Sequence, residues 1–161
     1  MMKDPNRPSL IVAAYQPDIP QNVGAMIRLC ACLNVGLDII EPCGFPWNDR
    51  KIRQSAMDYF DQADIHKHIS PQAFLDQYQD KRRIVLMSTQ SDCSYVDFSF
   101  RPDDILLAGR ESAGVPQEIH DCADARICIP MHGKMRSLNI VNATSMILGE
   151  ALRQTQWDRN G

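Results

Sequence analysis

The chain alternates between short apolar runs and longer stretches in which apolar residues recur at helical spacing. The apolar runs predict strands at 10–15, 37–40, 65–69, 83–89, 104–108 and 126–129. The helical spacing predicts helices at 21–33, 49–59 and 70–79, a short helix ending near residue 120, and a long helix from residue 138. Strands that alternate with helices are typical of an α/β protein with a mainly parallel sheet flanked by helices.

The last predicted helix is too apolar for an ordinary surface helix. One apolar stripe contains Leu138, Val141, Ser145, Leu148 and Leu152, and a second stripe contains Ile140, Ala143, Ile147 and Ala151. A helix with two apolar faces needs two covering surfaces, and the sheet of its own chain supplies one of them. We therefore predict a homodimer in which a second copy covers the other face. The alternative is a flanking helix of the same chain.

Three polar loops follow predicted strands, beginning near 89, 109 and 129. The carboxyl ends of parallel strands meet at one edge of a sheet, where ligands bind. Gly109 and Gly114 bracket a polar turn whose backbone can fold closely around a ligand. No Gly-x-Gly-x-x-Gly motif follows the first strand and no Walker lysine loop is present. Nicotinamide-cofactor and nucleoside-triphosphate functions therefore lose their main sequence support.

The length of 161 residues supports one domain over 1–161, for which we expect a flexible N-terminus at 1–8 and a frayed C-terminus at 155–161. The chain contains no long apolar run and no secretory leader, which favours a cytoplasmic protein without a membrane span. The formal net charge of −3 argues against a non-specific nucleic-acid coat protein. Local RNA binding needs only a cluster of cations, and the candidates are Arg28, Lys51, Arg53, Lys134, Arg136 and Arg153.

The cysteines and histidines do not predict a metal site. Six cysteines occur at irregular spacings without a Cys-x-x-Cys motif, which suits reduced thiols better than disulfides or zinc ligands. His66 and His68 share one face of a predicted strand, but no carboxylate or cysteine completes a ligand set. We interpret both histidines as surface residues.

Arg28 is unusual because it lies on an otherwise apolar predicted helix. Gly24 stands one turn before it, although glycine inside a helix costs about 1 kcal/mol relative to alanine. Two explanations remain open. The missing side chain either clears space for Arg28 or lets another backbone or a ligand approach the helix.

Three motifs together resemble those of the SpoU/TrmD (SPOUT) RNA methyltransferases. They are Asn22-x-Gly24-x-x-x-Arg28, then Leu107-Ala-Gly109-Arg-Glu111-Ser-x-Gly114-x-Pro116, and then Ile127-x-Ile129-Pro130-Met131 with Ser137-Leu138-Asn139. The segments 15–22, 40–45, 57–59 and 135–139 resemble the small TrmL (YibK-like) branch, the tRNA (cytidine/uridine-2'-O)-methyltransferases. The resemblance covers residues 10–154. Two positions depart from the branch: Arg110 stands where a proline is frequent, and Gln54 replaces a frequently basic residue.

The resemblance implies a SPOUT fold, in which the C-terminal segment of the sheet forms a deep trefoil knot that binds S-adenosylmethionine, and it implies a homodimer. The implied substrate is the ribose 2'-hydroxyl of the wobble nucleotide, a cytidine or modified uridine, in the anticodon stem-loop of tRNA. No metal is implied. The implied cofactor-binding residues are Met87, Gly109, Gly114, Ile129, Met131, Ser137 and Leu138.

The implied catalytic residues are Arg28, Asn22, Glu111, Ser137 and Asn139. A ribose hydroxyl is a poor nucleophile until its proton is removed or its developing charge is stabilised. Arginine holds its proton tightly, so we assign Arg28 to positioning and charge stabilisation. Asn22 would orient Arg28 or the ribose, Glu111 and Asn139 would shape the site by hydrogen bonding, and Ser137 would bond the cofactor or the ribose.

Three alternatives remain open at this point. The first is the same reaction on ribosomal RNA or another RNA. The second is a catalytically silent protein that binds the cofactor or RNA. The third is an α/β enzyme that acts on a small molecule, which would not need the cations Lys134 and Arg136 beside its site.

Overall fold

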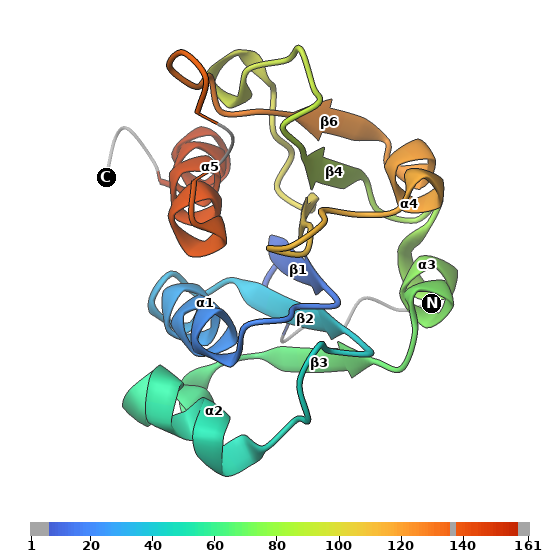
Figure 1. The fold of residues 1–161 in the computed structure, drawn as a ribbon. Coiled ribbons are helices and arrows are strands. Elements are labelled where there is room, and N and C mark those ends of the chain that lie inside the picture. Colours follow the sequence, from blue (N-terminus) through green and yellow to red (C-terminus); the bar gives the residue numbers. More distant parts are fainter. Residues whose placement is uncertain (1–6, 136–137, 158–161) are drawn as a thin grey trace.

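The computed structural model of the protein describes residues 7–135 and 138–157, and these form one six-stranded sheet. The order across the sheet is β3-β2-β1-β5-β4-β6, and each pair of neighbouring strands is parallel (Figure 1). The strands are β1 (Ile11–Tyr15), β2 (Gly36–Ile40), β3 (Ile65–His68), β4 (Ile84–Met87), β5 (Ile105–Ala108) and β6 (Ala125–Ile127). The predicted parallel α/β sheet is confirmed.

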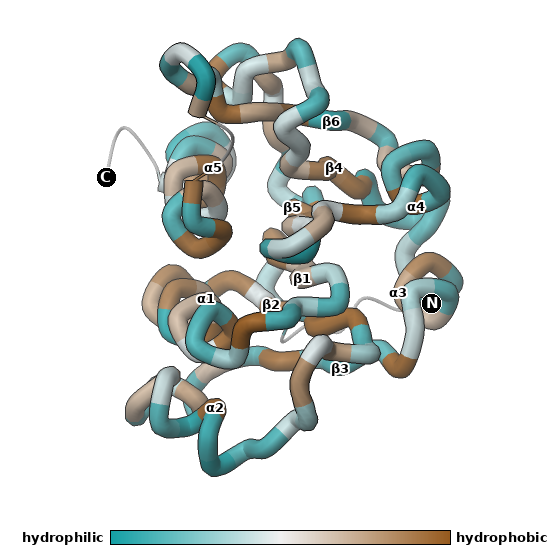
Figure 2. Tube along the Cα trace, viewed as in Figure 1, coloured by the Kyte–Doolittle hydropathy of each residue, from teal (hydrophilic) through white to brown (hydrophobic). Residues whose placement is uncertain are grey.

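Helices cover both faces of the sheet and divide the core in two. One face carries α1 (Pro20–Cys32), α2 (Asp49–Ala56) and α5 (Ile140–Thr155), and the other carries α3 (Pro71–Tyr78) and α4 (Gln117–Cys122) (Figure 1). Two 3₁₀ helices, η1 (Met57–Gln62) and η2 (Tyr95–Asp97), complete the described elements. The central strand β1 is buried on both faces, which explains why its sequence shows no polar alternation. By contrast, α2 is mostly hydrophilic and buries only two residues (Figure 2).

Two helix boundaries differ from the sequence prediction for local reasons. The helix predicted over 49–59 ends as α-helix at Ala56, and the chain continues as η1, whose first residue Met57 has a φ of 56°. The last helix begins at Ile140 rather than at Leu138. Its N-cap is Asn139, whose side-chain oxygen accepts hydrogen bonds from the backbone N–H groups of Val141 and Asn142.

Gly24 allows α2 to pack directly on α1. A Cβ atom built on Gly24 would lie 2.1 Å from the Cβ of Ser55 and 2.9 Å from its carbonyl carbon. No side chain fits there, because part of what it would meet is backbone. Of the two explanations for this glycine, the close approach of another backbone is therefore confirmed.

His68 is buried, so its interpretation as a surface residue was wrong. Its side chain is 6% exposed, and Nε2 lies 2.6 Å from Oδ2 of the buried Asp38. The Arg7 guanidinium also donates to Asp38 and to the Tyr78 hydroxyl. Burial opposes ionisation of Asp38, but the His68 hydrogen bond and the Arg7 charge together hold its pKa below the usual value. This cluster lies under α3 and joins the segment before β1 to the sheet.

Among the described residues, no helix has both the length and the apolar character needed to cross a membrane.

Candidate functional site

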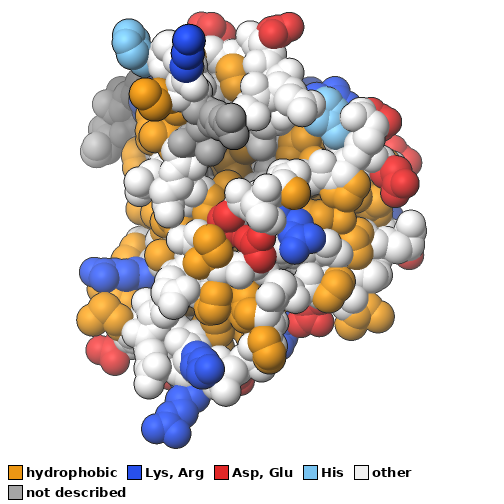
Figure 3. Space-filling view, in the orientation of Figure 1, with side chains coloured by type: hydrophobic (Ala, Val, Ile, Leu, Met, Phe, Trp, Pro, Cys, Tyr) orange, Lys and Arg blue, Asp and Glu red, His pale blue; other side chains and the backbone are white. Residues whose placement is uncertain are grey.

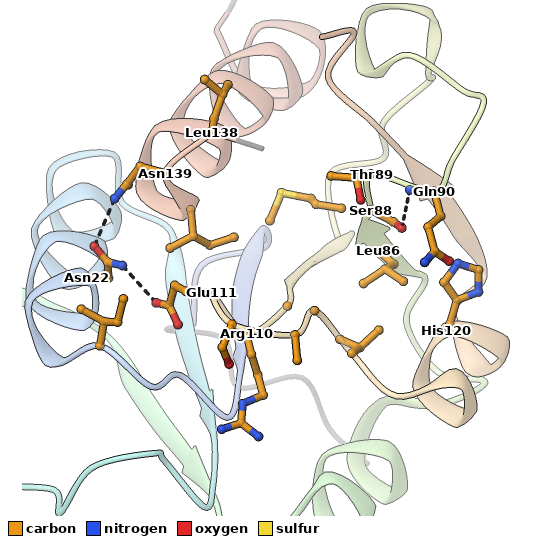
Figure 4. Close-up of a pocket in the computed structure, with 18 residues that line it drawn as sticks. Asn22, Leu86, Ser88, Thr89, Gln90, Arg110, Glu111, His120, Leu138 and Asn139 are labelled. Carbon is orange, nitrogen blue, oxygen red and sulfur yellow. Dashed lines mark hydrogen bonds between the residues drawn. The ribbon is translucent and has the colours of Figure 1, made fainter. Parts of the chain in front are cut away.

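A cavity of about 560 Å³ opens where β4 and β5 end (Figure 4). Its walls come from the loop after β4, the turn at 109–115, the first turn of α1, and the 138–140 segment that starts α5. The carboxyl ends of parallel strands and the N-termini of two helices therefore meet at one place. This is the sheet edge at which the sequence predicts ligand binding.

A smaller and mainly apolar cavity of about 100 Å³ adjoins the first. The walls of both cavities include Met87, Ser88, Thr89, Leu138 and Ile140. The smaller cavity is otherwise lined by Ile127, Cys128, Ile129, Met131, Ala143 and Ile147. The site can therefore hold a ligand that has a polar part and a flat or apolar part.

The turn at 109–115 is held closed by its own backbone. The backbone N–H of Arg110 donates to the Gly114 carbonyl at 2.9 Å, and the Gly114 N–H donates back to the Arg110 carbonyl at 2.9 Å. A Cβ on Gly109 would lie 2.8 Å from the Gly114 Cα, and Gly114 has a φ of 66°. Both positions require glycine, the first for space and the second for its left-handed conformation.

Three predicted catalytic side chains form a hydrogen-bonded chain along the cavity wall (Figure 4). Asn22 Nδ2 donates to Glu111 Oε1 at 3.1 Å, and Asn139 Nδ2 donates to Asn22 Oδ1 at 3.4 Å. Asn139 also caps α5. These hydrogen bonds thus link the first turn of α1, the turn after β5 and the start of α5, which are far apart in the sequence.

Arg28 lies apart from both cavities in the described chain. It is exposed, its Nη1 donates to the Met57 sulfur at 3.6 Å, and its guanidinium carbon lies 5.2 Å from the centre of the Tyr59 ring. Six residues along a helix turn the side-chain direction by about 240°, so Arg28 cannot share the cavity-facing side of α1 with Asn22. One chain alone does not bring Arg28 to the site.

The predicted cofactor-binding residues that the structure describes all line the two cavities. Met87, Gly109, Gly114 and Leu138 line the larger one, and Ile129 and Met131 line the smaller one. Ser137 lies outside the described residues. Within 7–135 and 138–157, no group of three or more His, Cys, Asp or Glu side chains could hold a metal ion.

The candidate RNA-binding cations differ in their surroundings. Lys51 and Lys134 are exposed, and Arg136 lies outside the described residues. Arg53 pairs with Asp61 at 2.7 Å, and Arg153 pairs with Glu150 at 2.6 Å. Figure 3 shows basic side chains projecting from the region of α2. The Arg53–Asp61 pair is exposed on both sides, and such pairs are weak, so Arg53 can exchange its partner for phosphate.

Sequence reasoning missed two polar residues at the site, Asp18 and His120. The backbone N–H of Asp18 donates to Glu111 Oε2 at 3.2 Å. His120 lines the larger cavity, its Nδ1 accepts from Arg126 Nε at 3.2 Å, and its buried Nε2 has no partner in the described chain. Asp18 follows β1 and Glu111 follows β5, so strand order could have joined them. No sequence signal marks His120.

The pKa values of Glu111 and Asp18 move in opposite directions. Burial raises the pKa of the Glu111 carboxyl above its usual value, and the hydrogen bond with the Asp18 side chain raises it further. The same hydrogen bond lowers the pKa of Asp18, with a further contribution from Ser112. The environment of the site therefore opposes ionisation of Glu111 and favours ionisation of Asp18.

Comparisons with known proteins agree on one family. The profile of the SpoU rRNA methylase family matches residues 9–149. The tRNA (cytidine(34)-2'-O)-methyltransferase of Beijerinckia indica is 58% identical over 145 residues, which cover 89% of this chain and 91% of that protein. A solved structure described as giving insights into the 2-OH methylation of C/U34 on tRNA has a TM-score of 0.86 and 36% identity, and the match covers 92% of this chain and 97% of that one. The SpoU methyltransferase AviRb from Streptomyces viridochromogenes, solved with AdoMet, has a TM-score of 0.82 and 28% identity over 93% of this chain and 62% of its own.

Proposed function

The chain belongs to the SpoU methylase family, and from this premise we propose that it transfers a methyl group from S-adenosylmethionine to the ribose 2'-hydroxyl of nucleotide 34 of tRNA. Relatives named for this reaction match the chain over nearly its whole length. We propose the cytoplasm as the compartment of this reaction, as expected for a tRNA substrate. The observation that carries the proposal is the pair of adjoining cavities, whose walls come from all three sequence motifs.

The two cavities suit S-adenosylmethionine. The cofactor combines an apolar purine with a charged amino-acid tail, and a small apolar cavity here adjoins a larger polar one. Met87, Ile129 and Leu138 would contact apolar parts of the cofactor. Gly109 and Gly114 have no side chains, so the cofactor could approach the backbone of their turn closely. Ser137 stays a predicted contact. When bound, the cofactor supplies a methyl group on a sulfonium sulfur, ready for in-line attack by an oxygen.

The residues of the chain orient the ribose and stabilise the charge that develops on its oxygen. Asn22 and Asn139 present amide groups to the cavity, and Glu111 fixes the orientation of Asn22. Preorganised groups of this kind need no rearrangement when the oxygen becomes negative. Arg28, once brought to the cavity by a second subunit, would contribute a positive charge near the 2'-oxygen or an adjacent phosphate.

A homodimer would supply the missing Arg28. Met146 on α5 is 43% exposed, and two further apolar residues are exposed beside its ends, Leu138 before the helix at 39% and Trp157 after it at 52%. Between them, a Cβ on Gly149 would have no atom within 4 Å. We propose that this face packs on a second copy and that Arg28 of the partner subunit then reaches the cavity.

Replacing Met146 with glutamate is expected to convert the dimer to a monomer at micromolar concentration. The change places a charge on the apolar face of α5, where a paired surface would have to desolvate it. Size-exclusion chromatography with light scattering measures the mass. Ile69→Glu is the matched control, since Ile69 is 81% exposed and lies outside this face. A wild-type protein that stays monomeric under the same conditions would refute the dimer.

We also propose that the C-terminal segment follows the knotted path of its family. The 88–104 connection contacts this segment at two places, which supports such threading. The Tyr95 N–H donates to the Cys128 carbonyl at 2.9 Å, and Gln154 Nε2 donates to the Phe98 carbonyl at 2.9 Å. A crystal structure that traces the chain through 128–140 tests the path.

Methyl transfer to tRNA is the direct test of the proposed function. The protein is incubated with S-adenosylmethionine labelled in the methyl group and with either total tRNA or ribosomal RNA, and the modified nucleoside is then mapped. We expect label only in tRNA, on the ribose at position 34. A tRNA transcript with 2'-deoxyribose at position 34 should accept no label, while a transcript with 2'-deoxyribose at position 33 should still accept it. Label confined to ribosomal RNA would favour the alternative substrate, and no label in any RNA would favour a silent binding protein.

A further inference from the structure

We propose that Arg110 binds a phosphate of the RNA substrate beside the target nucleotide and so helps to hold the target ribose at the cavity. Arg110 lies on the 109–115 turn, directly before Glu111, and it is one of the two positions at which the sequence departs from the branch that it resembles. The inference rests on the proposed function, from which it takes an RNA as the ligand. The contact itself can be measured without methyl transfer.

The turn fixes the backbone from which the Arg110 side chain starts. Arg110 and Gly114 exchange two backbone hydrogen bonds of 2.9 Å each. The next residue, Glu111, accepts from Asn22 Nδ2 at 3.1 Å on the cavity wall. Consecutive Cα atoms are only about 3.8 Å apart, so Arg110 starts close to the groups that would hold the ribose. The phosphates that flank this ribose would lie within one nucleotide of it.

The Arg110 side chain extends from the turn toward the loop after β2. Figure 4 shows it pointing away from the hydrogen bond between Asn22 and Glu111. A Cβ on Gly44 would lie 3.6 Å from Nη2 of Arg110, so the guanidinium reaches that loop. Arg110 Nε is buried, although the residue as a whole is partly exposed. The inner part of the side chain is therefore enclosed, and a ligand would meet the terminal amino groups.

The charge of Arg110 has no partner in the part of the chain that the structure describes. Its guanidinium forms no ion pair there, and its Nε makes no hydrogen bond. Arg83, by contrast, pairs with Asp104 at 2.6 Å. Glu111 does not neutralise Arg110, because its oxygens accept from Asn22 and from a backbone N–H. An enclosed side chain with an unpaired charge at the edge of a ligand site suits an anion.

The direction of the side chain favours phosphate over the carboxylate of the cofactor. The cofactor would lie inside the cavities, whereas the Arg110 guanidinium points away from the hydrogen-bonded groups on the cavity wall (Figure 4). An RNA strand would pass over the outside of the cavity to place one ribose in it. A guanidinium binds phosphate oxygens through two parallel hydrogen bonds. Such a contact positions the strand and reads no base.

The salt dependence of tRNA binding tests the contact, with S-adenosylhomocysteine present. One phosphate contact contributes about 0.7 to the slope of log affinity against log salt concentration for a single strand. In Arg110→Ala, the slope should be shallower by about 0.7, and Kd at low salt should rise about tenfold. Arg110→Lys keeps the charge and should keep the slope.

Arg101→Ala is the matched control, since Arg101 is exposed but precedes β5, at the opposite edge of the sheet. It should change neither the slope nor Kd. Urea unfolding should give the same midpoint for the wild type and Arg110→Ala, because the Arg110 guanidinium has no hydrogen bond or ion pair to lose within the described residues.

An uncharged phosphate analogue locates the contact on the RNA. Full-length tRNA is prepared with 2'-deoxyribose at positions 33 and 34 and with methylphosphonate in place of the phosphate on one side or the other of nucleotide 34. For the wild type, one of the two replacements should raise Kd about tenfold. For Arg110→Ala, the same replacement should change Kd by less than about twofold, because the cation that pairs with this phosphate is already absent. Equal losses in both proteins would assign the phosphate to another residue.

The outcomes separate this inference from the proposed function. If Arg110→Ala binds tRNA with the slope and Kd of the wild type, the phosphate contact is refuted. If Arg110→Ala weakens the binding of S-adenosylhomocysteine and not that of tRNA, Arg110 serves the carboxylate of the cofactor and the RNA contact is likewise refuted. If the slope changes as expected but the wild type transfers no methyl group to tRNA, the proposed function fails while the contact stands.

Discussion

Replacing Arg28 with alanine is expected to lower kcat for methyl transfer to tRNA by at least about 100-fold, the loss that removal of one transition-state donor typically causes. Arg28 is exposed, and within the described residues its guanidinium contacts Met57 and Tyr59. The replacement should therefore change the free energy of unfolding by less than about 0.5 kcal/mol. Single-turnover methyl transfer and urea unfolding measure the two effects.

Arg101→Ala is the matched control, since Arg101 is also exposed but precedes β5 at the amino edge of the sheet, opposite the cavity. It should keep wild-type transfer. If Arg28→Ala also keeps full transfer, the role assigned to Arg28 is wrong. Binding of S-adenosylhomocysteine, measured by calorimetry, should be similar in both variants, because Arg28 is assigned to the ribose oxygen or an adjacent phosphate and not to the cofactor.

Mixed dimers test whether Arg28 acts across the interface. Subunits carrying Arg28→Ala are combined with subunits carrying Asn22→Ala, each inactive by itself. If Arg28 serves the partner's cavity, a mixed dimer contains one site with both defects and one site with neither, so activity returns to about half per dimer. If Arg28 serves its own cavity, every site in the mixture keeps one defect and no activity returns.

Replacing Gly24 with alanine is expected to destabilise the protein by about 2 kcal/mol, although alanine is the better helix former by about 1 kcal/mol. The added Cβ would lie 2.1 Å from the Ser55 Cβ, so α2 would have to move away from α1. Ile52 and Ala56 of α2 are fully buried and would lose part of their packing. Urea unfolding at a fixed protein concentration measures the change.

A double-mutant cycle with Ser55→Gly identifies the cause. Removing the Ser55 Cβ relieves the shortest contact, so the double variant should lose less stability than the sum of the two single variants. The coupling will be incomplete, because the carbonyl carbon of Ser55 would still lie 2.9 Å from the new Cβ. Additive losses would mean that α2 packing is not what requires glycine at this position.

Local signals in the sequence predicted the order and type of the main elements. Apolar runs identified all the strands of the described sheet, and helical spacing identified α1 and α5 to within two residues at their starts. The carboxyl-edge rule then placed the loops at 89, 109 and 129 at one edge of the sheet, and in the described residues they line the two adjoining cavities. These features depend on neighbours in the sequence, so periodicity and turn chemistry suffice to find them.

The properties that depend on distant contacts were decided only by the tertiary structure. The strand pattern could not show that His68 is buried against Asp38, because the cover comes from Arg7 and from α3. Helix spacing could not choose between the two explanations for Gly24, because the choice depends on how closely α2 approaches α1.

By itself, then, the sequence determined the parallel α/β architecture and the edge of the sheet that holds the site. The tertiary structure decided which side chains contact one another at that site. It joined Glu111 to Asp18 and Asn22, and it left Arg28 exposed and away from both cavities of its own chain. The physical reason is that periodicity reports which faces of an element are apolar, whereas the partner that meets each face is set by long-range packing.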